Sequence, residues 1–242
     1  MKINTKNILL VIPYGGVGGM ERLAMTFYNQ YKSDGFEVKI IKIIKLPTDL
    51  INFGTDEIGL SEIDLHAMSL LKRFWFYLTI PFLIRQFIRK NKITHSISFG
   101  DLSNFFSSLT YTSEYKIASI HALKSAEFAK KSIFNSIFKF SYLYLYNNFK
   151  KVVCISKAIK KDLILNCNFK FVDKLIVIYN PHDISNIDYL SDLPILDEDE
   201  IKLNDLIKCQ GAFWIEILPI NKSTRFLKSF ISSSSKIGKS DK

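Results

Sequence analysis

Short apolar runs alternate with longer segments of helical periodicity over the first 180 residues of the chain. The first run, at 7–12, precedes a segment whose apolar residues recur at helical spacing, namely Met20, Leu23, Ala24, Phe27 and Tyr31. Further strands are predicted at 36–44, 93–98, 115–120, 151–155 and 174–178, and helices at 67–91, around 105–109, from 121 to about 149, and at 157–166. Residues 47–66 have no regular pattern and are expected to be irregular. This alternation predicts an α/β fold with a doubly wound, Rossmann-like parallel sheet.

The character of the chain changes near residue 190. Acidic residues gather between 192 and 205, as they often do in linkers, and serines and lysines dominate from 231 to the last residue. We therefore expect one domain over residues 1–190, followed by a linker and an irregular or disordered tail over 191–242.

Glycines interrupt the pattern between the first strand and the first helix. Gly15, Gly16, Gly18 and Gly19 occupy four of five consecutive positions. Glycine lets backbone N–H groups approach a ligand closely, and a helix N-terminus adds partial positive charge. The spacing matches neither the G-x-G-x-x-G dinucleotide fingerprint nor a P-loop. A connecting turn needs fewer glycines, so we expect all four to contact a substrate; a purely structural turn is the alternative.

The composition of the chain favours anionic binding partners but does not select one kind. The chain carries 33 basic and 23 acidic side chains, a net charge of +10, which favours anionic lipid, phosphorylated substrates or nucleic acid. No nucleic-acid-binding motif accompanies this charge, so no nucleic-acid partner is expected. Cys154, Cys167 and Cys209 have no metal-ligand spacing, and the N-terminus leads almost directly into a strand. We expect no bound metal, no signal peptide and a reducing, cytoplasmic location.

Two aromatic segments, at 70–85 and 134–146, each allow two interpretations. Only residues 74–84 lie between Arg73 and Arg85, and these are fewer than the about 20 residues that cross a bilayer. Basic residues flank the first segment on both sides. Each segment therefore predicts either a helix that packs on the core or one that lies on the surface of an anionic membrane.

Two polar residues follow predicted strands, and the carboxyl ends of parallel strands form the edge where α/β proteins bind ligands. Asp101 follows the strand at 93–98 and is a candidate for binding an acceptor substrate, with a helix N-cap as the alternative role. His121 follows the strand at 115–120, where its imidazole could bond a phosphate or a hydroxyl, or be an ordinary strand-end histidine. Ser156 begins a helix and is expected to cap it.

Several segments together resemble the N-terminal domain of retaining glycosyltransferases of family 4, which have the GT-B fold. The resemblance covers about residues 6–190 and depends on the order and spacing of segments 15–22, 35–38, 120–122, 152–163 and 174–181. It implies transfer of a hexose from a nucleotide-sugar to a polysaccharide or lipid-linked glycan of the cell envelope, without a cofactor. It also implies that the glycine loop lies beside the donor diphosphate and acceptor, and that His121 is the catalytic candidate near the reacting sugar.

The chain departs from this family after Asn204. The family's second domain carries a Gly-Arg pair and two glutamates spaced E-x7-E, and neither occurs here. We therefore expect a second domain that is truncated or frame-disrupted, and a chain that is weakly active or inactive alone. The alternative is a non-catalytic module of the same fold that binds an acceptor or a membrane. A nucleotide-dependent oxidoreductase is disfavoured by the glycine spacing.

Overall fold

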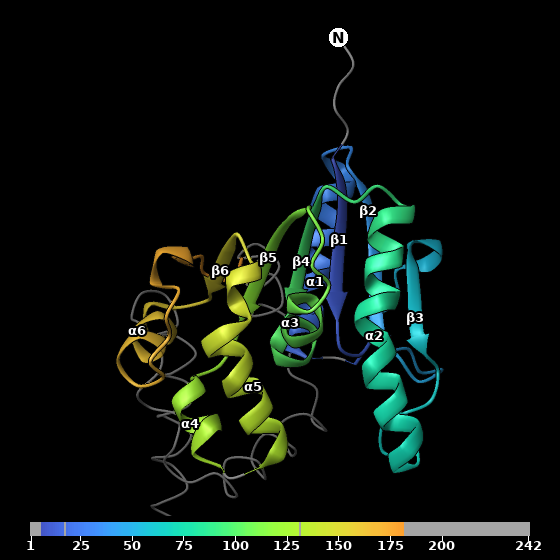
Figure 1. The fold of residues 1–242 in the computed structure, drawn as a ribbon. Coiled ribbons are helices and arrows are strands. Elements are labelled where there is room, and N and C mark those ends of the chain that lie inside the picture. Colours follow the sequence, from blue (N-terminus) through green and yellow to red (C-terminus); the bar gives the residue numbers. More distant parts are fainter. Residues whose placement is uncertain (1–5, 17, 131, 182–242) are drawn as a thin grey trace, which may run out of the picture. The chain divides into compact units, whose positions relative to one another are not determined.

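A computed structural model describes residues 6–16, 18–130 and 132–181 (Figure 1). In these residues, parallel strands form one sheet with the order β3-β2-β1-β4-β5-β6-β7. The strands are β1 (Asn7–Ile12), β2 (Glu37–Ile44), β3 (Glu57–Ser61), β4 (His95–Phe99), β5 (Tyr115–Ile120), β6 (Lys151–Cys154) and β7 (Leu175–Val177). The predicted Rossmann-like parallel α/β architecture is confirmed. Residues 182–242, which hold the predicted linker and tail, lie outside the described residues, and the boundary near 190 stays a prediction.

The helices lie on two faces of this sheet, and the strand order explains how they divide. They are α1 (Gly19–Ser33), α2 (Leu70–Lys90), α3 (Gly100–Ser108), α4 (Lys124–Ala129), α5 (Ile133–Tyr144) and α6 (Lys157–Leu165), with short 3-10 turns at Gly54–Asp56, Tyr146–Asn148 and Val172–Lys174. The chain moves in one direction from β1 to β3 and in the other from β4 to β7. Because parallel crossovers are right-handed, this reversal places α1 on one face and α2, α3, α5 and α6 on the other.

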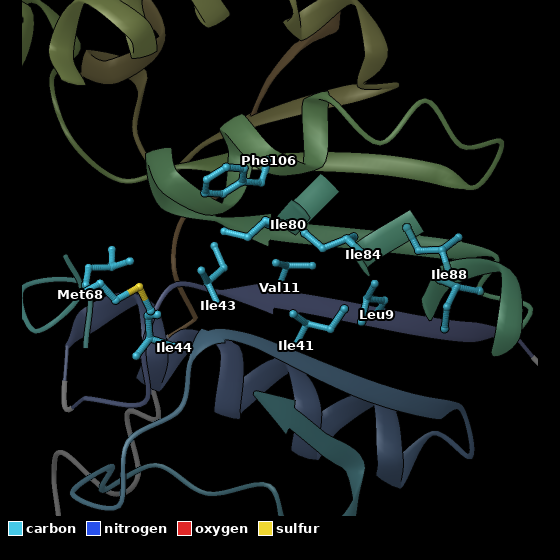
Figure 2. Packing of buried hydrophobic residues seen from close by; sticks show 12 residues of the cluster. Leu9, Val11, Ile41, Ile43, Ile44, Met68, Ile80, Ile84, Ile88 and Phe106 are labelled. Carbon is cyan, nitrogen blue, oxygen red and sulfur yellow. The ribbon is translucent and has the colours of Figure 1, made fainter. Parts of the chain in front are cut away.

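Successive side chains of β1 point alternately to the two faces of the sheet. Ile8, Leu10 and Ile12 pack with residues of α1, whereas Leu9 and Val11 pack with α2. On α2, the buried Ile80, Ile84 and Ile88 recur every four residues and lie along this core (Figure 2). The fold therefore rests on a strand that is buried on both faces, as its unbroken apolar sequence predicts.

The structure corrects the prediction for residues 47–66. This segment contains the 3-10 turn Gly54–Asp56 and the edge strand β3. The strand is short and begins with Glu57, whose carboxylate is buried because Lys42 and Lys45 pair with it. A buried glutamate makes a strand resemble a loop in the sequence, so the prediction was wrong. The helical region predicted up to about 149 is divided into α4, α5 and a 3-10 turn.

Candidate active site at the carboxyl edge of the sheet

The candidate residues gather where β1 and β4 lie side by side and their following connections diverge. Such a switch point is where open α/β sheets hold ligands. The glycine loop follows β1, Asp101 lies in the first turn of α3 after β4, and His121 follows β5. In Figure 1 these strands end at the lower edge of the sheet. The sequence correctly places the three features on one edge.

Gly15 has a packing role that the sequence did not predict. It is buried, and a Cβ atom at this position would lie 2.6 Å from Lys42 Nζ and closer still to the Asp49 carboxylate. Its carbonyl oxygen accepts hydrogen bonds from the backbone N–H groups of Leu50 and Ile51, at 3.1 and 3.0 Å. The structure accounts for this glycine by close packing, and its contact with a substrate stays a prediction.

The packing partner of Gly15 is a buried ion cluster centred on Lys42. The Lys42 side chain is fully buried in β2, and its Nζ lies 3.0 Å from Asp49 and 3.0 Å from Glu57. It also donates to the Ile51 carbonyl at 2.6 Å. A buried ammonium group is tolerated because three oxygens surround it. The cluster joins β2, β3 and the loop after β2 beneath the glycine loop.

Gly16 and Gly19 differ from Gly15 because they face open space. A Cβ atom at either position would contact nothing within 4 Å, and both residues are exposed. Gly18 is the N-cap of α1, where no side chain caps the helix, and its near neighbour is the buried Glu21 carboxylate. The exposed part of the loop can therefore approach a ligand. The carboxylate of Glu21 favours a ligand hydroxyl over a second anion at this point.

The turn after β4 packs against the start of α1. Gly100 has a φ of +79°, in the left-handed region that favours glycine, and is buried. A Cβ atom there would lie 2.7 Å from the Met20 sulfur. The connections that follow β1 and β4 are therefore in contact, and a side chain at position 100 would separate them.

Asp101 is bound on both carboxylate oxygens. Lys124 Nζ lies 2.8 Å from one oxygen, and the Tyr142 hydroxyl donates to the other at 2.8 Å. Burial raises the pKa of Tyr142 well above its usual value, so the hydroxyl keeps its proton. The N-cap of α3 is Phe99, so the alternative role of Asp101 as a helix cap was wrong. Substrate binding by Asp101 stays a prediction. Ser156, by contrast, accepts from the Ile159 N–H and caps α6 as expected.

Lys124 is a residue of the site that the sequence did not reveal. It is the first residue of α4, is only 3% exposed, and also binds Glu127 at 2.6 Å. A single lysine after a histidine has no distinguishing pattern. Its importance appears only when Asp101, in the first turn of α3, is brought beside it. Together these side chains link the ends of β4 and β5 to α5.

His121 follows β5 and lies near this network, whose Lys124 and Asp101 charges act on it. Its ring centre is 6.1 Å from that of Phe99. Its Nε2 is buried and has no hydrogen-bond partner among the residues that the structure describes. Burial, with a smaller contribution from the Lys124 charge, lowers the pKa of His121 to about 4, and the Asp101 charge partly opposes this shift. At neutral pH the imidazole is therefore uncharged and suited to hydrogen-bond a hydroxyl group.

Two surface cavities among the described residues are lined by helices and by none of the candidate site residues. One, of about 490 Å³, is lined mainly by α5 residues, and the other, of about 370 Å³, by α6 residues. The described residues hold no cluster of metal-ligating side chains, and no described helix has the length and apolar character needed to cross a bilayer. Whether the reaction needs a metal or cofactor is untested, and its absence stays a prediction.

The buried Gly15 and the exposed Gly16 predict different effects of an alanine substitution on stability. We expect Gly15→Ala to lower the free energy of unfolding by about 1–3 kcal/mol, because the methyl group would displace the Lys42–Asp49 pair. Gly16→Ala, which enters open space, is the matched control, with an expected change within about 0.5 kcal/mol. Urea unfolding followed by circular dichroism measures both. Equal losses in the two variants would contradict the packing role of Gly15.

The lowered pKa of His121 predicts a pH-dependent contribution to stability. Between pH 6.5 and about 4 the unfolded chain binds a proton at this position and the folded chain does not. Stability attributable to His121 is therefore lost as the pH falls through this range. We expect the difference in unfolding free energy between the wild type and His121→Gln to decrease from pH 6.5 to 4. A difference that stays constant across this range would show that the folded histidine has an ordinary pKa.

Solved structures of glycosyltransferases share this fold. Sucrose-phosphate synthase from Thermosynechococcus elongatus superposes with a TM-score of 0.57 at 13% identity, over 78% of this chain and 53% of that one. The apo form of the lipopolysaccharide outer core galactosyltransferase WaaB gives a TM-score of 0.54 at 12% identity, over 74% and 46%. Anabaena Alr3699/HepE, in complex with UDP and glucose, gives 0.52 at 13% identity, over 97% and 67%. Such identities establish the fold alone.

The chain spans about half the length of the first two of these proteins. No curated protein sequence matches it significantly. The model of the family described as Glycosyltransferase Family 4 matches residues 17–186, which include the exposed end of the glycine loop, Asp101 and His121. The chain therefore belongs to glycosyltransferase family 4, as its sequence motifs predict.

Proposed function

We propose that this protein transfers a hexose from a nucleotide-sugar to a polysaccharide or lipid-linked glycan, with retention of anomeric configuration, and that the described domain holds the acceptor. The observation that carries the proposal is the unpartnered Nε2 of His121, at the same sheet edge as the exposed Gly16 and Gly19. Family membership supports the reaction class. The Anabaena neighbour in complex with UDP and glucose supports a nucleotide-sugar donor.

The charge state of His121 favours a role toward sugar rather than phosphate. A neutral imidazole offers one N–H donor and one acceptor nitrogen, which suits a sugar hydroxyl. Burial keeps the imidazole neutral at physiological pH, and the charge of the neighbouring Lys124 adds to this effect, whereas the Asp101 charge partly opposes it. We propose that His121 binds a hydroxyl group of the reacting sugar. The N–H groups of Gly16 and Gly19 would position the same ligand from the opposite side of the edge.

The donor's diphosphate needs positive groups as it leaves, and the buried lysines near this edge are occupied. Lys42 is paired with Asp49 and Glu57, and Lys124 with Asp101 and Glu127. We therefore propose that this chain alone transfers sugar weakly. The same pairing favours the second candidate function, a non-catalytic module that binds an acceptor. Acceptor binding without transfer would distinguish that module from the enzyme.

The place of action that we propose is the cytoplasm, with peripheral contact at the inner face of the cytoplasmic membrane. The aromatic and basic helices α2 and α5 support this contact, as does the lack of carboxylates in both. A lipid-linked acceptor is presented at that surface.

Radiolabelled transfer tests the proposed reaction. The purified chain is incubated with tritiated UDP-glucose, UDP-galactose or GDP-mannose and a bacterial lipid extract as acceptor, and label in the glycolipid fraction is counted. We expect slow transfer from one donor and a loss of at least about 100-fold in His121→Ala, because the hydroxyl contact is removed.

His95 begins β4 and so lies at the opposite, amino edge of the sheet, so His95→Ala is the matched control and is expected to keep full activity. Equal activity of His121→Ala and the wild type would contradict the assigned site. Acceptor binding without transfer from any donor would favour the non-catalytic module. The anomeric configuration of the product, read by NMR, tests retention.

A further inference from the structure

The first turns of α2 and α5 expose large apolar side chains at the same end of the molecule as the candidate site. In a parallel α/β fold a crossover helix runs antiparallel to the strands, so its N-terminal turns lie at the carboxyl edge. Both helices are on the same face of the sheet, and their first turns reach past the strand ends in Figure 1. We call these turns the apolar tips; they comprise Leu70, Leu71, Phe74 and Trp75 on α2, and Ile133 and Phe134 on α5.

The exposure of the tips is high enough to require an explanation. Leu70 is 81% exposed and Ile133 is 79% exposed, and Trp75 is 60% exposed. The C-terminal half of α2 packs through Ile80, Ile84 and Ile88, although Phe82 is 70% exposed there, whereas its N-terminal half presents several apolar residues to solvent together. Solitary exposed apolar residues are ordinary, but a clustered set marks an interaction surface.

The two tips are joined into one surface. The rings of Tyr77 on α2 and Phe134 on α5 meet edge to face, with centres 6.3 Å apart. Behind them, Phe105 of α3 packs against Phe138 of α5, at 6.1 Å between ring centres. The tips are therefore held on a packed aromatic base rather than on separate flexible segments.

The charge around the apolar tips favours an anionic binding partner. Helices α1, α3 and α4 each carry a carboxylate in the first turn, namely Glu21, Asp101 and Glu127, whereas α2 and α5 carry none along their whole length. Exposed Lys72 and Lys139 stand on these two helices instead. The N-terminal dipole ends of α2 and α5 thus add to lysine charge, and neither helix carries a carboxylate of its own to offset it.

A polar cavity accompanies the tip of α5. It has a volume of about 490 Å³, and Lys130, Ser132, Asn135 and Lys139 line it together with Ile133. Lysines beside an apolar residue suit a phospholipid, because the lysines can bind its phosphate while its acyl chains lie against the apolar residue. Large apolar and aromatic side chains, basic flanks and a headgroup-sized polar cavity are the combination that interfacial helices use on membranes.

We propose that the apolar tips insert into the interfacial layer of an anionic phospholipid bilayer. The carboxyl edge, with Gly16, Gly19 and His121, then faces the membrane. One consequence rests on the proposed function: the acceptor is a lipid-linked glycan held in that membrane rather than a free polysaccharide. The docking itself is independent of sugar transfer.

Tryptophan fluorescence tests the docking directly. The chain has two tryptophans, Trp75 and Trp214, so Trp214→Phe leaves Trp75 as the only emitter. Vesicles of phosphatidylcholine with phosphatidylglycerol are expected to shift the Trp75 emission to shorter wavelength, and brominated lipid in the same vesicles is expected to quench it. Vesicles of phosphatidylcholine alone are expected to do much less. No shift and no quenching with the anionic vesicles would overturn the proposal.

Paired variants test the surface by vesicle co-sedimentation. Leu71→Ser with Ile133→Ser is expected to lower partition into anionic vesicles at least about tenfold, because apolar surface no longer enters the interface. The matched control, Leu165→Ser with Val172→Ser, removes apolar residues that are 63% and 42% exposed on other elements and should leave partition unchanged. Equal losses in both double variants would overturn the assignment.

A second pair tests the charge. Lys72→Gln with Lys139→Gln is expected to weaken partition about fivefold per lysine at low salt. Lys150→Gln with Lys161→Gln changes the net charge equally on other exposed positions and is expected to change it little. Equal weakening of vesicle partition by both pairs would show that only the net charge of the protein matters. That result would contradict binding through the apolar tips.

Gel filtration tests the other possible binding partner of the apolar tips, which is a second copy of the chain. A dimer that Leu71→Ser with Ile133→Ser dissociates, without vesicle binding by the wild type, would overturn the lipid assignment. All of these measurements omit the sugar donor. A chain that binds vesicles but transfers no sugar refutes the proposed function alone, and a chain that transfers sugar but ignores vesicles refutes the docking alone.

Discussion

The buried charge of Lys42 is the constraint on which the candidate site depends. A lysine ammonium group can lie within a parallel sheet only if oxygens surround it, and here Asp49, Glu57 and the Ile51 carbonyl do so. To reach it, the loop after β2 must fold back beneath Gly15, and β3 must pair with β2. The glycine loop is therefore positioned by an ion cluster that lies outside the ligand edge, which leaves Gly16 and Gly19 open.

A second buried lysine has the same effect on the other side of the switch point. Lys124 binds Asp101, which in turn accepts from Tyr142, so the ends of β4 and β5 are tied to α5. Burial keeps the neighbouring imidazole of His121 neutral, and the Lys124 charge adds to this effect. An edge whose lysines are paired and whose histidine is uncharged is suited to sugar hydroxyls. This agrees with an acceptor-binding role for the described domain of a family 4 glycosyltransferase.

Much of the fold could be predicted because burial leaves a periodic apolar pattern, as in β1 and the Ile80-Ile84-Ile88 series of α2. The same pattern placed Asp101, His121 and the glycines at one edge of the sheet, although their contact with a substrate stays a prediction. The roles of Lys42 and Lys124 could not be predicted, because a lysine is buried only when partners distant in sequence neutralise it. The strand β3 was missed for the same reason, since its buried residue is Glu57.

Hydrogen exchange measured by mass spectrometry, with and without UDP-glucose and a bacterial lipid extract, tests the central claim most directly. If the carboxyl edge between β1, β4 and β5 holds the sugar ligands, amides in peptides spanning 13–22 and 120–124 will exchange more slowly when ligands are present. The peptide spanning 157–165 on α6 will be unchanged. Protection confined to α6, or none at the glycine loop and His121, would contradict the account.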